Sequence, residues 1–174
     1  MIWYGLLVAA AAGERVAELV VARRNERWSA ARGATVSGQG HYPAMVALHT
    51  GLLGGCLYEV WLADRPFLPA LAWPMLALFK AAQALRWWCV RTLGLRWNTR
   101  VIVVPGLPLV TGGPYRWLRH PNYVAVVAEG VALPLIHTAW VTATLFTLLN
   151  AALLTVRIRC ENRALAASTT PVSA

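Results

Sequence analysis

Two separate stretches of the sequence combine residue types that can bind a charged ligand. The first, GPYRWLRHPNY, runs from Gly113 to Tyr123 and carries a histidine, an asparagine and two tyrosines immediately before an apolar segment. The second, RIRCENRAL, spans residues 157–165 and places Arg157 and Glu161 four residues apart, on one face of a helix. The Arg157 guanidinium is a permanently charged fork that can orient an anion, although the same spacing also suits a plain surface ion pair.

The segment before these residues favours a rigid loop. VIVVPGLPLVTGGPY, residues 101–115, mixes β-branched residues with prolines and glycines, a composition that opposes a helix and favours tight bends. Such a loop can close over a cofactor. Pro121 suits the first turn of a helix, where free backbone N–H groups can meet an anion such as an amino-acid carboxylate. The alternative for this stretch is an ordinary, well-capped membrane helix.

Composition indicates a small membrane protein that forms a single domain over residues 1–174. Of the 174 residues, 58% are hydrophobic and 13% charged, and the mean hydropathy is +0.52. The net charge of +9 does not indicate nucleic-acid binding, because the basic residues lie in short stretches between apolar segments. Three widely spaced cysteines suggest neither a disulfide framework nor a metal site.

The apolar segments predict an all-α integral membrane protein with five transmembrane helices. Spans of roughly 17 to 25 apolar residues are expected for such helices. The expected spans are Ile2–Val21, Pro43–Ala63, Phe67–Leu85, the shorter Asn122–Ile136, and Thr138–Val156.

Arginine clusters set the expected orientation. They follow the first, third and fifth spans, whereas the opposite loops carry only Arg65. By the positive-inside bias, the N-terminus is expected outside, and a loop region that binds a cofactor is expected in the cytoplasm, with a C-terminal helical extension. The clusters are Arg23, Arg24, Arg27 and Arg32; Arg86, Arg91, Arg96, Arg100, Arg116 and Arg119; and Arg157, Arg159 and Arg163.

Glu129 is an acid inside the fourth expected span. A carboxylate within a span is costly enough to suggest a functional site, so Glu129 is expected to contact a substrate. The alternative is an ion pair with an intramembrane cation such as Lys80. Glu14, Arg15 and Glu18 can satisfy one another, and a structural role is expected for them.

The two stretches resemble the membrane isoprenylcysteine carboxyl methyltransferase family, whose pattern is a G-P/V-Y-x-x-x-R-H-P-x-Y core and an R-I-x-x-E-E-type ending. The resemblance covers roughly Leu95 to Leu165. The N-terminal half, with ARRNERW and RGATVSGQGHYPAMVALH, is similar to a bacterial branch found beside type III polyketide synthases and implicated in O-methylating alkylpyrones.

The resemblance implies S-adenosylmethionine as methyl donor and a lipophilic acceptor that arrives from the bilayer. It places the acceptor's anionic end at Arg157, and a second acid of the family's ending is replaced here by Asn162. Donor affinity is the property that this replacement affects. The implied donor-binding residues are Leu107, Pro108, Leu109, Val110, Tyr115, His120, Pro121, Asn122, Tyr123 and Glu161.

Methyl transfer from a sulfonium to an oxygen anion is an in-line displacement, so alignment and exclusion of water are the main tasks. Arg157 and His120 are the expected catalytic residues: Arg157 orients the acceptor, and His120 holds the donor or takes a proton from a protonated acceptor. The rings of Tyr115 and Tyr123 can hold the adenine or attract the sulfonium.

Several functions remain open from the sequence. An alkylpyrone or alkylresorcinol hydroxyl and a prenylcysteine carboxylate both present an anion on a long apolar tail. A related helical membrane fold is used by NADPH-dependent sterol-type reductases, which makes an oxidoreductase the first alternative class. A non-enzymatic membrane scaffold is the second.

Overall fold

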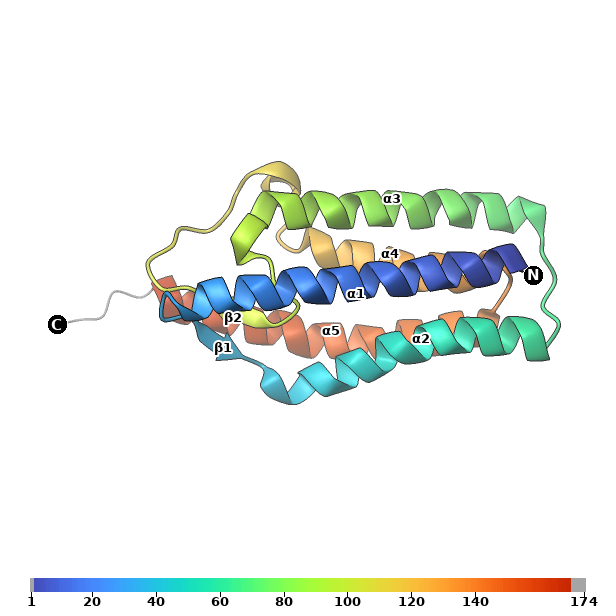
Figure 1. Ribbon diagram of the computed structural model, residues 1–174, viewed down its shortest axis with the longest axis horizontal. Helices are drawn as coiled ribbons and strands as arrows, with labels where there is room; N and C mark the ends of the chain where they lie inside the picture. Colours follow the sequence, from blue (N-terminus) through green and yellow to red (C-terminus); the bar gives the residue numbers. More distant parts are fainter. Residues whose placement is uncertain (1, 170–174) are drawn as a thin grey trace.

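The described chain forms five α-helices, and they run along one long axis as a bundle (Figure 1). The computed structural model describes residues 2–169. The α-helices are α1 (Ile2–Ala30), α2 (Tyr42–Leu62), α3 (Pro69–Leu93), α4 (Pro121–Leu135) and α5 (Trp140–Thr169). Short 3-10 helices lie at η1 (Gln39–His41), η2 (Gly94–Arg96) and η3 (Gly113–Arg116), and two strands at β1 (Thr35–Ser37) and β2 (Val101–Val103).

The connections divide between the two ends of the bundle. The N-terminus lies at one end with the α2–α3 and α4–α5 links, while β1, β2, the long α3–α4 connection and the end of α5 gather at the other (Figure 1). The arginine-rich stretches therefore share one end, as the sequence predicts. We refer to this as the loop end of the bundle.

Apolar side chains fill the space between the helices at the N-terminal end. Tyr4, Val8, Val60 and Leu133 are almost completely buried there, and the Tyr4 hydroxyl donates a hydrogen bond of 3.0 Å to the Leu133 carbonyl. A Cβ atom added at Gly130 of α4 would lie 2.0 Å from the Phe146 ring of α5. The absence of a side chain at Gly130 therefore lets α4 and α5 approach closely.

The five expected spans correspond to the five α-helices, but their lengths and polarity differ from the prediction. Only α2 and α5, within Gln39–Leu62 and Trp140–Ala167, are long and apolar enough among the described residues to qualify as membrane spans by composition. α1 and α3 carry buried charges. α4 has 15 residues, or about 22 Å of helix, which is less than the hydrocarbon thickness of roughly 30 Å.

Two helices, α3 and α5, extend further than the predicted spans and therefore include arginines that were expected to follow those spans. α3 continues to Leu93, so Arg86 is not a loop residue as predicted; it lies inside the helix and is 4% exposed. α5 continues without a break from its apolar part through Arg157 to Thr169, which confirms the predicted C-terminal helical extension.

A small β-sheet at the loop end was not predicted. β1 and β2 pair antiparallel, with Thr35 opposite Val103 and Ser37 opposite Val101. The β-branched run after Arg100 forms a strand instead of an irregular loop because the segment after α1 provides its partner. Arg100 also forms a 2.9 Å ion pair with Glu26 of α1, so that β2 is fixed to the bundle.

Buried ionic groups join α1, α3 and α4. Glu129 of α4 accepts hydrogen bonds from Arg15 at 2.7 Å and from Arg86 at 2.5 Å, and Arg15 also pairs with Glu18 at 2.8 Å. Gln83 accepts a weaker hydrogen bond from Arg15 at 3.4 Å. Two cations thus balance two anions, an arrangement that offsets the cost of burying charge.

Glu59 connects the end of α2 to the start of α5. Its carboxylate accepts hydrogen bonds from the backbone N–H groups of Val141 and Thr142, at 3.1 and 2.7 Å, and pairs with Arg65 at 2.8 Å. The carboxylate therefore caps α5 from another helix, where the positive end of the helix dipole favours an anion.

We expect Glu59→Ala to lower the free energy of unfolding by roughly 1 to 3 kcal/mol, because two backbone donors and Arg65 lose their acceptor. The midpoint of thermal unfolding in detergent measures the effect. Glu14→Ala is the matched control, since no ion pair involves Glu14 in the described part of the chain. Equal midpoints for the two variants would show that Glu59 does not stabilise the start of α5.

Candidate active site

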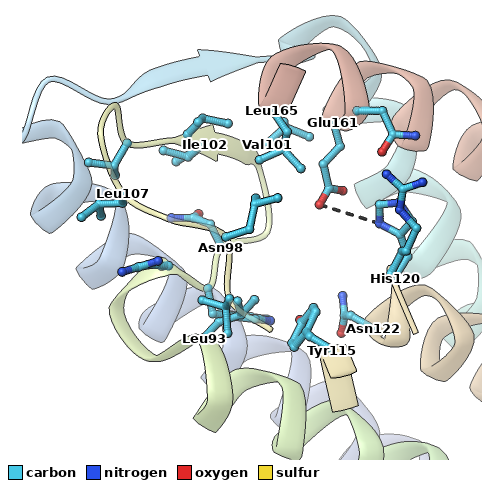
Figure 2. A pocket seen from close by; sticks show the side chains of 18 of the residues that line it. Leu93, Asn98, Val101, Ile102, Leu107, Tyr115, His120, Asn122, Glu161 and Leu165 are labelled. Carbon is cyan, nitrogen blue, oxygen red and sulfur yellow. Dashed lines mark ion pairs between the residues drawn. The ribbon is translucent and has the colours of Figure 1, made fainter. Parts of the chain in front are cut away.

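A pocket of about 360 Å³ opens at the loop end of the bundle, a volume within the usual range for small-molecule sites. Its walls come from the end of α3, from β2, from the loop that follows β2, from η3, and from α4 and α5 (Figure 2). It brings together ten of the predicted site residues: Leu107, Pro108, Leu109, Val110, Tyr115, His120, Asn122, Tyr123, Arg157 and Glu161.

Side chains from α1 and η2 fix the outer wall of this pocket. The Asn25 amide donates hydrogen bonds to the carbonyls of Gly94 and Trp97, at 3.1 and 2.7 Å. Arg96 donates a 2.6 Å hydrogen bond to the Pro108 carbonyl in the loop after β2. The proline- and glycine-rich loop is therefore tied to the bundle; that it closes over a cofactor stays a prediction.

Arg157 lies at the base of the pocket and is 6% exposed. Its Nε–H donates to the Tyr123 hydroxyl at 2.8 Å, Nη2 donates to the Thr99 carbonyl at 2.7 Å, and Nη1 lies 3.2 Å from the Met45 sulfur. Among the described residues, no carboxylate forms an ion pair with this guanidinium. A buried cation that has only neutral partners favours an anionic ligand.

Tyr123 connects Arg157 to Glu161. Its hydroxyl accepts a hydrogen bond from Arg157 and donates one to the Glu161 carboxylate. Arg157 and Glu161 are therefore not the direct surface ion pair that their spacing also allowed. Instead, one phenol bridges the two charged groups across the base of the pocket.

His120 belongs to the same group of residues. Its ring stacks on that of Tyr123, with centroids 5.3 Å apart and planes inclined by 18°. Its Nδ1 lies 3.9 Å from Glu161 Oε1, the contact drawn as a dashed line in Figure 2. The Glu161 carboxylate is thus close enough to help orient the His120 ring.

Unsatisfied carboxamide atoms line the pocket. Both side-chain polar atoms of Asn98, and Oδ1 of Asn122, are buried without a hydrogen-bond partner in the described structure. Buried polar atoms are normally paired, so these atoms indicate where a polar ligand would bind. Asn98 was not predicted from the sequence, because an isolated asparagine carries no motif signal.

Tyr115 closes the pocket toward α3. Burial raises the pKa of its phenol above the ordinary value, and the neighbouring Cys89 thiol, with which it forms a hydrogen bond, raises it further. Tyr115 is therefore a neutral group at physiological pH. Gly113 makes this packing possible: its φ is +55°, and an added Cβ would lie 2.4 Å from the Thr92 hydroxyl.

Two predicted site residues do not line the pocket. Pro121 is the first residue of α4, as expected from its type, and is buried behind the pocket wall. Glu129 lies two turns further along α4 and is bound to Arg15 and Arg86, so the prediction that it contacts a substrate finds no support in its position. The alternative that Glu129 pairs with a cation inside the bundle is confirmed, but the cations are Arg15 and Arg86, whereas Lys80, the cation suggested by the sequence, is exposed.

Comparison with protein families places the chain in a class of membrane methyltransferases. Residues 75–167 match the isoprenylcysteine carboxyl methyltransferase (ICMT) family, and these residues contain α4, most of α5 and nearly the whole pocket. The chain belongs to this family. It is also 41% identical over 166 residues to the uncharacterized protein YpbQ of Bacillus subtilis, an alignment that covers 95% of this chain and 96% of the relative.

Proposed function

We propose that the protein is an S-adenosylmethionine-dependent O-methyltransferase that acts on a lipophilic anionic acceptor. The observation that carries the proposal is the single pocket that joins residues 107–123 to Arg157 and Glu161. Membership in the ICMT family favours methyl transfer over the reductase and scaffold alternatives. An enzyme of this kind needs a polar donor site next to a site for an anion, and the pocket contains residues suited to both.

The proposal includes a membrane orientation. All five helices would cross the bilayer of the cell membrane, which would thin locally around the short α4, with the buried charges of α1, α3 and α4 paired inside the bundle. The N-terminus would lie outside, and the loop end with its arginines, the pocket and the C-terminus would face the cytoplasm. The donor would then reach the pocket from the aqueous side and the acceptor from the bilayer.

The residues that line the pocket fit S-adenosylmethionine. Asn98 and Asn122 supply unsatisfied carboxamide atoms for the polar edges of a nucleoside or an amino acid. Glu161 supplies a negative charge, and the aromatic faces of Tyr115 and Tyr123 suit an adenine or a cation. When bound, the donor supplies an electrophilic methyl group on a positively charged sulfur. Asn162 also lines the pocket but brings no charge.

The acceptor end of the proposal rests on Arg157. Its guanidinium can hold an oxygen anion and orient it for in-line displacement, in which the new O–CH₃ bond forms as the S–CH₃ bond breaks. An acceptor that is already ionised needs no strong base. His120, next to Glu161, would take a proton from an acceptor that arrives protonated. Leu107 and Leu109, both exposed at the rim, would help to exclude water.

We further propose that the acceptor is an alkylpyrone or alkylresorcinol hydroxyl, made by an enzyme of the type III polyketide synthase class. An acidic hydroxyl on a ring that carries an alkyl chain matches a buried cation next to a bilayer. The similarity of the N-terminal half to a bacterial branch implicated in this chemistry supports this choice. A prenylcysteine carboxylate is the alternative acceptor.

Donor binding has a direct thermal test. We expect S-adenosylmethionine and S-adenosylhomocysteine to raise the midpoint of thermal unfolding of the purified protein, because a ligand that binds only the folded state stabilises it. At a concentration of 100 times Kd the gain is about 2.7 kcal/mol. Asn98→Ala should weaken this binding by roughly five- to a hundredfold, since it removes buried hydrogen-bonding groups. Stabilisation by NADPH instead would favour the reductase alternative.

A further inference from the structure

A second hollow lies beside α5, on a different face from the candidate active site. Its walls come from α5, β1 and η1, and the lining includes Ser37, His41, Val156, Arg159, Cys160 and Arg163. The described residues that line this hollow are all different from those that line the active-site pocket. A Cβ added at Gly38 would lie 2.3 Å from the His41 ring and 2.9 Å from the Cys160 sulfur. The segment around η1 is therefore packed closely against α5.

The described lining of the hollow carries positive charge and contains no acidic side chain. Arg159 and Arg163 lie one helical turn apart, and both side chains are exposed. In the described part of the chain neither has a carboxylate within ion-pair distance, whereas Arg65 and Arg100 do. His41 adds hydrogen-bonding ring nitrogens to the same lining.

The position of the hollow along α5 matches the boundary of a bilayer. Val156 is 50% exposed and is the last residue of the apolar part of α5 before the arginines. Arg159 and Arg163 follow it by about one and two turns, at the level where the hydrocarbon of a bilayer gives way to lipid phosphates. One ligand could therefore place acyl chains beside Val156 and an anionic group between the arginines.

We propose that this hollow is a binding site for the headgroup phosphate of an anionic phospholipid. Arg159 and Arg163 hold the phosphate through charge-assisted hydrogen bonds, and Ser37 and His41 provide further hydrogen-bonding groups at its edge. Basic pockets beside transmembrane helices are a recurrent way of binding anionic lipids. This site goes beyond the proposed methyl transfer and does not depend on it, because it shares no lining residue with the active-site pocket.

Cys160 gives this proposal a built-in reporter. The chain has three cysteines; Cys56 and Cys89 are fully buried, whereas Cys160 is partly exposed in the hollow. The experiment measures the rate at which a maleimide alkylates the full-length protein in neutral detergent micelles. The additions are phosphatidylglycerol, phosphatidylcholine or inorganic phosphate. We expect phosphatidylglycerol to slow the alkylation of Cys160 severalfold and the other two additions to leave the rate nearly unchanged.

Matched double variants test the role of the arginines. Arg159→Gln with Arg163→Gln should weaken the protective effect of phosphatidylglycerol by roughly tenfold or more, because two charge-assisted contacts are lost. Arg23→Gln with Arg27→Gln removes the same charge at the same spacing from the exposed surface of α1 and should retain full protection. The comparison uses the ratio of rates with and without lipid in each variant, since the substitutions also change the reactivity of the thiol itself.

Folding is checked in the same samples. A folded variant presents one reactive thiol, whereas an unfolded variant presents three. If the double variant at residues 159 and 163 unfolds, the single variant Arg163→Gln replaces it in the comparison. The proposal is overturned if phosphatidylglycerol protects no better than phosphatidylcholine, or if both double variants keep equal protection. Equal protection by inorganic phosphate would also overturn it, because the hollow would then be a site for free phosphate. The alkylation experiment does not depend on methyl transfer, so a failure of the lipid-site proposal can be distinguished from a failure of the proposed function.

Discussion

Replacing Arg157 by lysine is expected to lower methyl transfer to a lipophilic acceptor by roughly ten- to a hundredfold while leaving donor binding nearly intact. Lysine keeps the charge, but it cannot reproduce the fork that contacts Tyr123 and Thr99 and still offers N–H groups to an anion. Loss of a charge-assisted contact in a largely dry site costs on the order of 1.5 to 3 kcal/mol, which corresponds to this range of rates.

The measurement pairs donor affinity by calorimetry with turnover of an alkylpyrone, for the wild type and each variant. Arg23→Lys, on the exposed surface of α1, is the control and should turn over normally. Glu161→Gln should have the opposite effect: donor affinity should fall more than turnover of the acceptor does. Full turnover by Arg157→Lys would remove this residue from the acceptor site, and equal loss of donor and acceptor binding in both variants would contradict the assigned roles.

Tyr123→Phe gives an additional test of the bridge between the two sites. This substitution keeps the ring that stacks on His120 but removes the hydroxyl that joins Arg157 to Glu161. Because both charged groups lose a partner, we expect turnover to fall more than donor affinity, by roughly ten- to a hundredfold. Unchanged turnover would show that the bridge does not position either residue.

The second large effect is expected at Glu129 and concerns stability. Glu129→Gln should destabilise the protein by about 3 to 5 kcal/mol, because Arg15 and Arg86 would remain buried with only Glu18 to balance them. The midpoint of thermal unfolding in detergent measures this loss. Donor affinity per folded molecule should not change, since Glu129 does not line the pocket.

A double-mutant cycle separates this structural role from the substrate contact that the sequence suggests. Arg86→Gln combined with Glu129→Gln restores the charge balance and should be less destabilised than Glu129→Gln alone. If Glu129→Gln instead unfolds at the wild-type midpoint and only raises the KM for the acceptor, the ion cluster is not its main role and the substrate contact is correct.

The sequence predicted the residues of the pocket better than it predicted its walls. Sequence alone predicted four residues of the pocket, because their types and spacing form a recognisable pattern: His120, Tyr123, Arg157 and Glu161. Asn98 was missed, since its importance appears only when the fold leaves its polar atoms buried and unpaired. The pairing of β1 with β2 was missed for a similar reason: a three-residue strand is defined by its partner, and local composition says little about it.

The sequence misplaced charges where long-range packing decides their environment. Arg86 counts as a loop residue when the third span ends at Leu85, yet α3 continues to Leu93 and directs this arginine toward Glu129. The partners of Glu129 lie 114 and 43 residues away along the chain, and no local pattern links them. Lys80, the cation suggested by the sequence, is exposed and lies further from Glu129 along the chain than Arg86 does.

The proposed methyl transfer runs from S-adenosylmethionine to a lipophilic anion held at Arg157. The most direct measurement incubates the purified protein with S-adenosylmethionine carrying a labelled methyl group and with an alkylpyrone or a prenylcysteine, followed by mass analysis of the products. We expect the label on the alkylpyrone oxygen, formed by the wild type and strongly reduced in Arg157→Lys. Acceptors that remain unlabelled although the donor is bound, or equal labelling by both proteins, would contradict it.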